Sequence, residues 1–86
     1  MQEETKEILL SRPIEIDGKK TSTLVMRRPI IKDLFLFGGN EAEAELRMMA
    51  HLCGLMVTIE EMYTWDASVY MHMKATYSYF LGLSGK

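Results

Sequence analysis

The middle of the chain carries apolar residues at helical spacing. Positions three or four residues apart fall on one side of a helix, and they predict a helix over residues 41–53 with one apolar face. That face consists of Leu46, Met49, Ala50 and Cys53. Gly54 follows where a residue in the left-handed conformation commonly ends a helix, so the helix is expected to stop there. Asn40, with Glu43 three residues on, is expected to cap its start.

Two further helix starts can be predicted from side chains that cap backbone amides. Thr58 and Glu61 have the spacing of a capping box, in which each side chain accepts a hydrogen bond from the backbone N–H group of the other residue. A short helix over residues 59–63 is expected to begin there. Asp66 can cap the next helix, whose apolar run extends from Val69 to Leu81.

The N-terminal third alternates between apolar and polar positions, as β-strands do. Residues 8–16 and 20–28 predict the strands of a hairpin around Asp17-Gly18, a pair that tolerates the positive φ angles of a tight turn. Pro13 has no backbone N–H group to donate, so the first strand is expected to be an edge strand or to be interrupted there.

The length of the hairpin loop decides which side chains share a face. A two-residue loop would pair Ile14 with Thr21 and would separate the apolar residues of the second strand from those of the first. A three-residue, bulged loop places them all on one face, and we therefore predict that loop. The expected inner face consists of Ile8, Leu10, Ile14, Leu24 and Met26.

A helix over residues 30–37 is expected after the hairpin. Pro29 suits the first turn of a helix, where a missing N–H group costs nothing. Apolar residues cover nearly the whole circumference of this segment, so we expect the helix to be wedged between the hairpin and the later helices. Lys32 and Asp33 are expected at its surface.

Together these elements predict an α+β domain, in which an N-terminal β-hairpin packs on a small bundle of three to four helices. The chain has 86 residues, 48% of them apolar, which suits a single small domain with one modest core. We expect the hairpin over residues 7–28 and the helical part over residues 29–82. The charged residues 1–6 are expected to form a disordered tail, and residues 83–86 a frayed end.

Charge and hydropathy exclude several classes of protein. A net charge of −2 and a pI near 5.6 give none of the broad positive field that nucleic-acid binding needs. In a helix-turn-helix interpretation residues 59–63 would be the recognition helix, but Glu60 and Glu61 would repel phosphate. No apolar run approaches the roughly 20 residues of a membrane span, and the acidic N-terminus is unlike a signal peptide. We expect a soluble intracellular protein that binds neither nucleic acid nor membrane.

No catalytic, cofactor or metal site is expected. His51 and Cys53 lie about 200° apart around a helix, so they cannot share a metal ion or act as base and nucleophile without a third element. His72 is expected at the surface or partly packed. Cys53, the single cysteine, is expected to be a small buried apolar residue. The sequence therefore predicts a protein that is not an enzyme.

The helices carry more apolar residues than one small core needs. Met48 and Leu52 lie opposite the core face of the 41–53 helix, where a surface helix normally shows charge. In the last helix the core face is expected to be Val69, Met73, Thr76, Tyr77 and Phe80, and a second apolar face to be Met71, Ala75 and Tyr79. The 8 methionines supply flexible contact surface. Two explanations stay open: a Met-rich core with a dimer interface, or apolar surface that meets another protein.

Several short motifs, taken in order, resemble one family of phage proteins. They are Pro13, Gly18, the Arg27-Arg28-Pro29 junction with Asp33-Leu34, Leu52-Cys53-Gly54-Leu55, Thr58-Ile59-Glu60-Glu61-Met62, Trp65-Asp66 and Phe80-Leu81-Gly82. This order and spacing resembles the small tail assembly chaperones of contractile-tailed phages and Mu-like prophages, the tail assembly protein E family. The chain departs from the family at Cys53, where threonine is common, and at the bulky Tyr63 and Trp65.

The resemblance implies a non-enzymatic protein of the host cytoplasm that is absent from the mature virion. Its partner would be the long, helical tape-measure protein, which it would keep soluble until the tail tube polymerises around it. Family members are often also made as a longer frameshifted form, a hypothetical second partner, and codons for Gly85-Lys86 could form the slippery run. The alternative is a small homo-oligomeric structural or regulatory protein without a chaperone role.

We expect the partner to bind one continuous apolar strip on two antiparallel helices. Met48 and Leu52 would supply it from the 41–53 helix, and Met71, Ala75 and Tyr79 from the last helix. Small apolar surfaces of this kind bind helices by packing them in a groove. If replacing Met48 and Met71 together by Glu unfolds the monomer, these residues are core. If the variant stays folded and still binds, the site is expected on the side of Tyr63 and Trp65.

Overall fold

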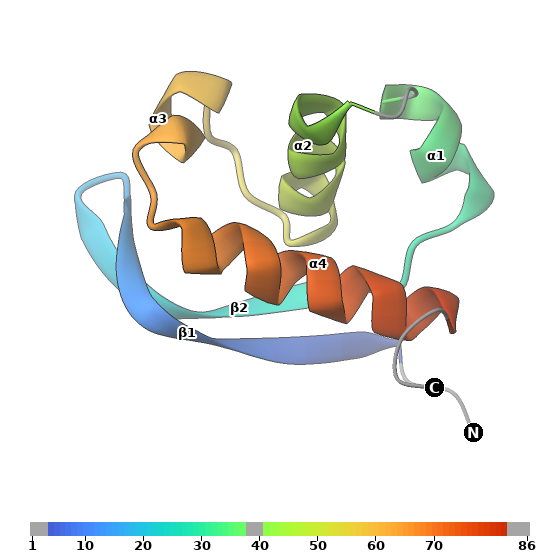
Figure 1. Ribbon diagram of the computed structural model, residues 1–86, viewed down its shortest axis with the longest axis horizontal. Coiled ribbons are helices and arrows are strands. Elements are labelled where there is room, and N and C mark those ends of the chain that lie inside the picture. The colour runs from blue at the N-terminus through green and yellow to red at the C-terminus, as the bar shows by residue number, and fades with distance from the viewer. Residues whose placement is uncertain (1–3, 38–40, 83–86) are drawn as a thin grey trace.

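The computed structural model describes residues 4–37 and 41–82. Within these residues the chain forms the strands β1 (Thr5–Ile16) and β2 (Lys19–Arg27), then the helices α1 (Ile31–Phe37), α2 (Ala42–Leu52), α3 (Ile59–Tyr63) and α4 (Ala67–Leu81). Figure 1 shows α4 lying along the hairpin, α2 standing upright across α4, and α3 and α1 at opposite ends of the molecule. The predicted α+β fold, a hairpin on a small helical bundle, is confirmed.

The hairpin begins earlier than predicted. β1 starts at Thr5 rather than near residue 7, because Thr5 pairs with Arg27 and Lys6 pairs with Met26. These two residues therefore belong to the antiparallel ladder and not to a disordered tail. The predictions for residues 1–3, for the capping residue Asn40 and for residues 83–86 lie outside the described residues.

The hairpin loop is shorter than predicted. Ile16 pairs with Lys19, so the loop is the two-residue turn Asp17-Gly18 and the expected three-residue bulged loop is wrong. Both loop residues have a positive φ, 53° at Asp17 and 78° at Gly18. This backbone matches the twist of the flanking strands, which explains why the chain adopts the tighter turn.

An irregularity inside β1 restores the common apolar face. Leu9 lies opposite Thr23, but the next paired residue, Ile14, lies opposite Thr21, so β1 carries extra residues at this point. Pro13 lies within the interruption, as its missing N–H group predicts. The predicted inner face is therefore confirmed despite the different loop: Ile8, Leu10, Ile14, Leu24 and Met26 are all buried. Val25, on the other face, is exposed.

Local hydrogen bonds confirm the predicted helix boundaries after α1. The Thr58 hydroxyl accepts from the Glu61 N–H group at 3.2 Å, and the Glu61 carboxylate accepts from the Thr58 N–H group at 3.1 Å. The Asp66 carboxylate accepts from the Ser68 N–H group at 3.0 Å and caps α4. Gly54 ends α2 in the left-handed conformation, with a φ of 71°. Glu41 precedes α2, and its side chain makes no capping bond.

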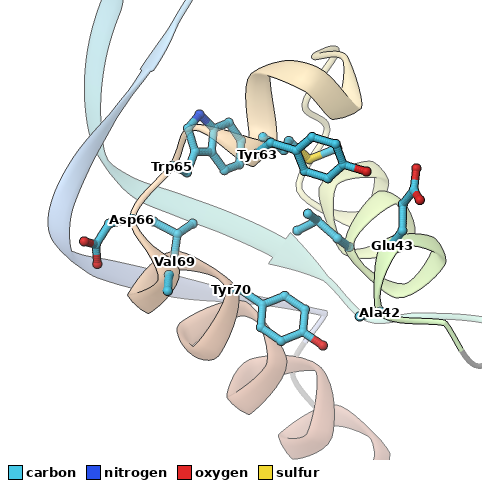
Figure 2. A pocket seen from close by; sticks show the side chains of 10 residues that line it. Ala42, Glu43, Tyr63, Trp65, Asp66, Val69 and Tyr70 are labelled. Atoms are coloured by element: carbon cyan, nitrogen blue, oxygen red, sulfur yellow. The ribbon is translucent and has the colours of Figure 1, made fainter.

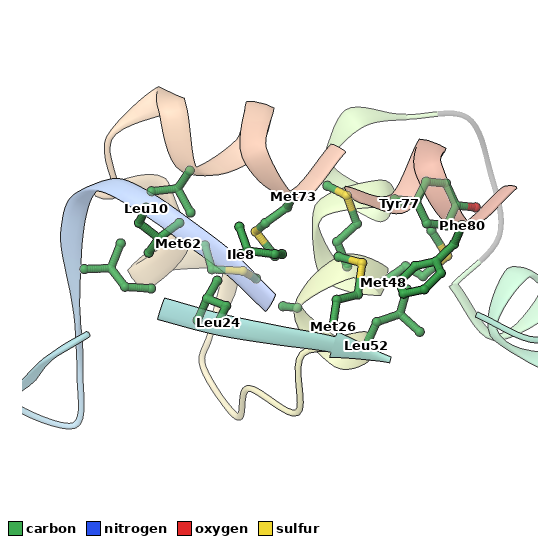
Figure 3. Packing of buried hydrophobic residues seen from close by; sticks show 14 residues of the cluster. Ile8, Leu10, Leu24, Met26, Met48, Leu52, Met62, Met73, Tyr77 and Phe80 are labelled. Carbon is green, nitrogen blue, oxygen red and sulfur yellow. The ribbon is translucent and has the colours of Figure 1, made fainter. Parts of the chain in front are cut away.

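The core lies between the hairpin, α4 and α2 (Figure 3). Met26, Met49 and Met73 are each completely buried, so one methionine from β2, one from α2 and one from α4 occupy its centre. The predicted core face of α4 is confirmed, since all of its residues are buried: Val69, Met73, Thr76, Tyr77 and Phe80. On α2 the predicted face is confirmed at Met49 and Ala50, while Leu46 and Cys53 are only partly buried.

Candidate partner-binding site

An apolar groove opens between α2, α3 and the first turns of α4 (Figure 2). Its volume is about 350 Å³. The lining residues are apolar (Leu46, Met62, Val69, Ala42, Ala67), aromatic (Tyr63, Trp65, Tyr70) or acidic (Glu43, Asp66). In Figure 2 the rings of Tyr63 and Trp65, from the α3 side, lie across the opening from Val69 and Tyr70 on α4.

Helix caps fix the walls of this groove. The capping box holds the start of α3, and the Trp65 N–H group donates to the Met62 carbonyl at 3.1 Å at its end. Asp66 follows at once and caps α4. Because α3 and α4 are joined by so short a capped link, Trp65 is held beside the start of α4 rather than on a free loop.

A carboxylate on α2 ties that helix to α4 beside the groove. Glu45 accepts a hydrogen bond from the Tyr70 hydroxyl at 2.9 Å and one from the Lys74 ammonium group at 2.9 Å. The pKa of Tyr70 is raised, mainly by burial and secondly by the Glu45 carboxylate. Glu45 also raises the pKa of Lys74. Tyr70 and Lys74 therefore both keep their protons, and donate to Glu45, at neutral pH.

The rim of the groove is acidic. Glu43 forms an ion pair with Arg47 at 3.0 Å, and Asp66 lies 3.9 Å from Arg12, yet each of these carboxylate side chains is 44% exposed. The pKa of Tyr63 is raised, mainly by partial desolvation and secondly by the Glu43 carboxylate, so its phenol is neutral. The groove thus offers an apolar interior lined at its edge by two partly exposed carboxylates, each of which also lies near an arginine outside the lining.

Helix α1 is held by its polar side, the reverse of what the sequence predicted. Asp33 was expected at the surface but is buried, and it accepts hydrogen bonds from Arg27 at 2.8 and 2.9 Å. The same carboxylate accepts from the Ile30 N–H group at 2.8 Å. The Arg27 hydrogen bonds are the main reason that the pKa of Asp33 is lowered to about 2. Charge pairing, rather than apolar packing, therefore fixes the orientation of α1.

The apolar side of α1 faces solvent as a result. The helix packs chiefly on α2, and Phe37 contacts the His51 ring at 5.3 Å between centroids. The remaining large apolar side chains are exposed: Ile30, Ile31, Leu34, Phe35 and Leu36. The prediction that this helix is wedged in the interior is therefore wrong.

The second arginine of the junction, Arg28, holds the C-terminal end of α4. The Arg28 guanidinium donates to the Phe80 carbonyl at 3.3 Å and lies 5.0 Å from the centre of the Phe80 ring. A cation at this position also suits the negative C-terminal end of α4. Arg27 and Arg28 thus secure α1 and α4 respectively, which gives the Arg27-Arg28-Pro29…Asp33 motif a structural role.

Comparison with known families decides the identity of the chain. Residues 7–82 match the family described as phage tail assembly chaperone proteins, E, or 41 or 14. The chain belongs to this phage tail assembly chaperone family. No curated protein and no solved structure matches it.

Two residues predicted to bind the partner lie in the core of this tail assembly chaperone. Met48 and Leu52 were expected on the outward side of α2, but they are 6% and 2% exposed. The reason is that α2 contacts α4, the hairpin and α1 on different sides, so it buries more than one face. These side chains are not available at the surface of the folded monomer.

The outward side of α4 is exposed as predicted, but it does not continue onto α2. Met71, Ala75 and Tyr79 are all exposed, and the Lys6 ammonium group lies 4.7 Å from the centre of the Tyr79 ring. Helix α2 crosses α4 in Figure 1 instead of running antiparallel beside it. The expected continuous strip is therefore wrong, and its α4 part remains as a separate exposed face.

Tyr63 and Trp65, the second predicted location, both line the groove. Tyr63 is 62% exposed, and Trp65 is partly buried. The sequence did not predict that Leu46, Met62 and Tyr70 would join them, because this depends on how α2 crosses α4. The exposed face of α1 was also missed. The sequence feature that could have revealed this face is Asp33. It lies three residues after Ile30, close enough to accept a hydrogen bond from the Ile30 N–H group, and it could also pair with Arg27.

The described histidines and the single cysteine do not line the groove. No group of three or more His, Cys, Asp or Glu side chains within residues 4–37 and 41–82 could hold a metal ion. Burial raises the pKa of Cys53 to about 12, so the thiol is not a nucleophile at neutral pH. His72 shares a hydrogen bond of 2.9 Å with Ser11. Within the same residues, no helix is long and apolar enough to cross a membrane.

Proposed function

We propose that this tail assembly chaperone binds the tape-measure protein of its phage and keeps it soluble until the tail tube polymerises around it. Membership of the family supports a role in tail assembly. The observation that carries the finer proposal is the apolar groove lined by Tyr63, Trp65 and Val69. A groove of this kind binds the apolar face of a helix through a few anchor side chains.

The size of the groove limits what one copy can cover. Ligand pockets span about 300–1,000 Å³, and this groove, at about 350 Å³, is at the small end of that range. It has room for one or two large side chains of a helix, not for a long segment. We therefore propose that many copies, each binding weakly, shield one tape-measure protein in the host cytoplasm, and that the chaperone is absent from the mature virion.

Co-expression with the tape-measure protein of the same phage tests this proposal. The wild-type chaperone is expected to increase the soluble fraction of the tape-measure protein and to co-purify with it. Ala67→Glu places a carboxylate in the groove at the first residue of α4, where negative charge suits the helix start, so the fold should persist. This variant is expected to lose most of the co-purified tape-measure protein.

Met71→Glu is the matched control, because Met71 lies exposed on the same helix but does not line the groove. It is expected to behave as the wild type. A tape-measure protein that stays insoluble with the wild-type chaperone would contradict the chaperone role. Equal binding by the two variants would contradict the groove as its site.

A further inference from the structure

Helix α1 displays an apolar surface that the chain itself does not cover. Phe35 is 82% exposed, Ile31 is 70% exposed and Leu36 is 58% exposed, all on a helix of 7 residues. Ile31 and Phe35 are four positions apart, so they lie on the same side of the helix. Exposed apolar residues gathered in this way mark a contact surface for another molecule.

The orientation of α1 is fixed, so this surface cannot turn inward. Asp33 lies on the opposite side of the helix, buried, and holds both Arg27 and the Ile30 N–H group. Turning Phe35 toward the core would expose or unpair this buried carboxylate, which is costly. In Figure 1 α1 lies at the opposite end of the molecule from α3, which forms one wall of the groove. The exposed side chains of Ile31 and Phe35 on α1 are called the projection below. One copy therefore presents this apolar projection at one end and an apolar groove towards the other.

Charge favours contact between projection and groove over contact between two projections. Lys32 is the exposed charged residue of α1, because Asp33 is buried and paired. In a symmetric pair of α1 helices two Lys32 side chains would approach each other with no exposed carboxylate on α1 to offset them. The groove instead carries exposed carboxylates, Glu43 and Asp66, at its rim. Complementary charge of this kind orients partners and disfavours the wrong pairing.

We infer that α1 of one copy docks in the groove between α2, α3 and α4 of a second copy. Phe35 and Ile31 enter the apolar interior, and Lys32 lies near the acidic rim. The contact joins two different surfaces, so each added copy still offers one free α1 and one free groove, and open rows can form. The groove, at about 350 Å³, has room for only one or two large side chains, so the contact is small, and association is weak and depends on concentration.

This inference goes beyond the proposed function, since it concerns contact between copies of the chaperone. It also predicts a regulation of the same groove: the tape-measure protein and a neighbouring α1 compete for it. Excess chaperone would be stored with its groove covered, and each copy would expose the groove when a tape-measure helix displaces the neighbour.

Sedimentation velocity at increasing concentration tests the inference with two variants and their mixture. Wild-type protein is expected to shift from monomer to larger species as its concentration rises. Phe35→Glu removes the projection and Ala67→Glu blocks the groove, so each alone is expected to raise the concentration needed for association more than tenfold. A mixture of the two retains one intact projection and one intact groove, and it is expected to form dimers and nothing larger.

Two control variants place the same charge elsewhere. Leu9→Glu lies on the exposed face of the hairpin and Met71→Glu on the exposed side of α4, and both are expected to associate as the wild type does. Circular dichroism checks the fold of each variant; if Ala67→Glu is less helical, Tyr63→Glu, at an exposed position in the groove, takes its place.

Three outcomes would overturn the inference: wild-type protein that is monomeric at all concentrations, a folded groove variant that still associates alone, or a mixture that stays monomeric. Failure here is distinguishable from failure of the proposed function. Phe35→Glu leaves the groove intact, so it is expected to bind the tape-measure protein whether or not copies associate.

Discussion

Arg27 donates two hydrogen bonds to Asp33, from Nη1 to Oδ2 at 2.9 Å and from Nη2 to Oδ1 at 2.8 Å. The pair joins the end of β2 to the first turn of α1 across six residues of sequence. A bidentate pair of this kind is directional as well as strong. It therefore sets which side of α1 faces the protein, and the exposed apolar side follows from it.

Removal of the Asp33 charge should destabilise the protein in a pH-dependent way. The pKa of Asp33 is lowered from 3.8 to about 2, so its ionised form stabilises the fold above about pH 4, and this contribution is lost as the pH falls to 2. Asp33→Asn is expected to lower the free energy of unfolding by about 2 kcal/mol at pH 7. Its difference from the wild type should shrink between pH 4 and pH 2.

Urea unfolding at several pH values measures this effect. Glu15→Gln, which neutralises an exposed carboxylate on β1, is the control and is expected to change the free energy of unfolding little. An Asp33→Asn variant as stable as the wild type at pH 7 would show that the ion pair does not anchor α1.

Met48 and Met71 were both predicted from the sequence to lie on one apolar strip, but their replacement by alanine should lower the free energy of unfolding by very different amounts. Met48 is 6% exposed and Met71 is 62% exposed. Met48→Ala leaves a cavity in the core and is expected to cost about 2–4 kcal/mol of unfolding free energy, whereas Met71→Ala should cost less than about 0.5 kcal/mol. Thermal or urea unfolding of both variants provides the comparison. Similar losses in the two would contradict the assignment of Met48 to the core.

The features that the sequence predicted correctly are those that depend on nearby residues. The capping box of Thr58 and Glu61 and the cap at Asp66 each need only a few consecutive positions. The two faces of α4 were also predicted, because the helix packs mainly along β1 and needs one apolar stripe. Tyr63 and Trp65 were named as an alternative binding site and both line the groove, but partner binding there stays a prediction.

The features that were predicted wrongly depend on contacts between distant elements. Met48 and Leu52 are core residues because α2 contacts α1, α4 and β2, which its own periodicity does not reveal. Similarly, Asp17-Gly18 forms a two-residue turn, although the apolar pattern had suggested a three-residue loop. The register shift at Pro13 restores the common apolar face that the shorter loop would have broken. For α1, the number of apolar residues suggested burial, but the ion pair at Asp33 determined the outcome.

The single cysteine should react slowly in the folded protein. Burial raises the pKa of Cys53 from 9.0 to about 12, so at pH 8 the reactive thiolate is about a thousandfold scarcer than for an ordinary thiol. Reaction with a disulfide reagent at pH 8 is expected to be at least about a hundredfold slower in the native protein than in denaturant.

The matched control carries its only cysteine at the exposed position 22, through Cys53→Ser and Ser22→Cys. This cysteine should react equally fast in the native protein and in denaturant. Rapid reaction of Cys53 in the native wild type would show that the end of α2 opens readily.

Fluorescence of Trp65 tests the central claim most directly. It is the only tryptophan of the chain, and it lines the groove. Titration with a tape-measure protein that lacks tryptophan, at a chaperone concentration where the protein is monomeric, is expected to shift the emission to shorter wavelength and to reach saturation, because the bound helix excludes water from the indole. A complex that forms by sedimentation while the Trp65 emission stays unchanged would contradict the groove as the binding site.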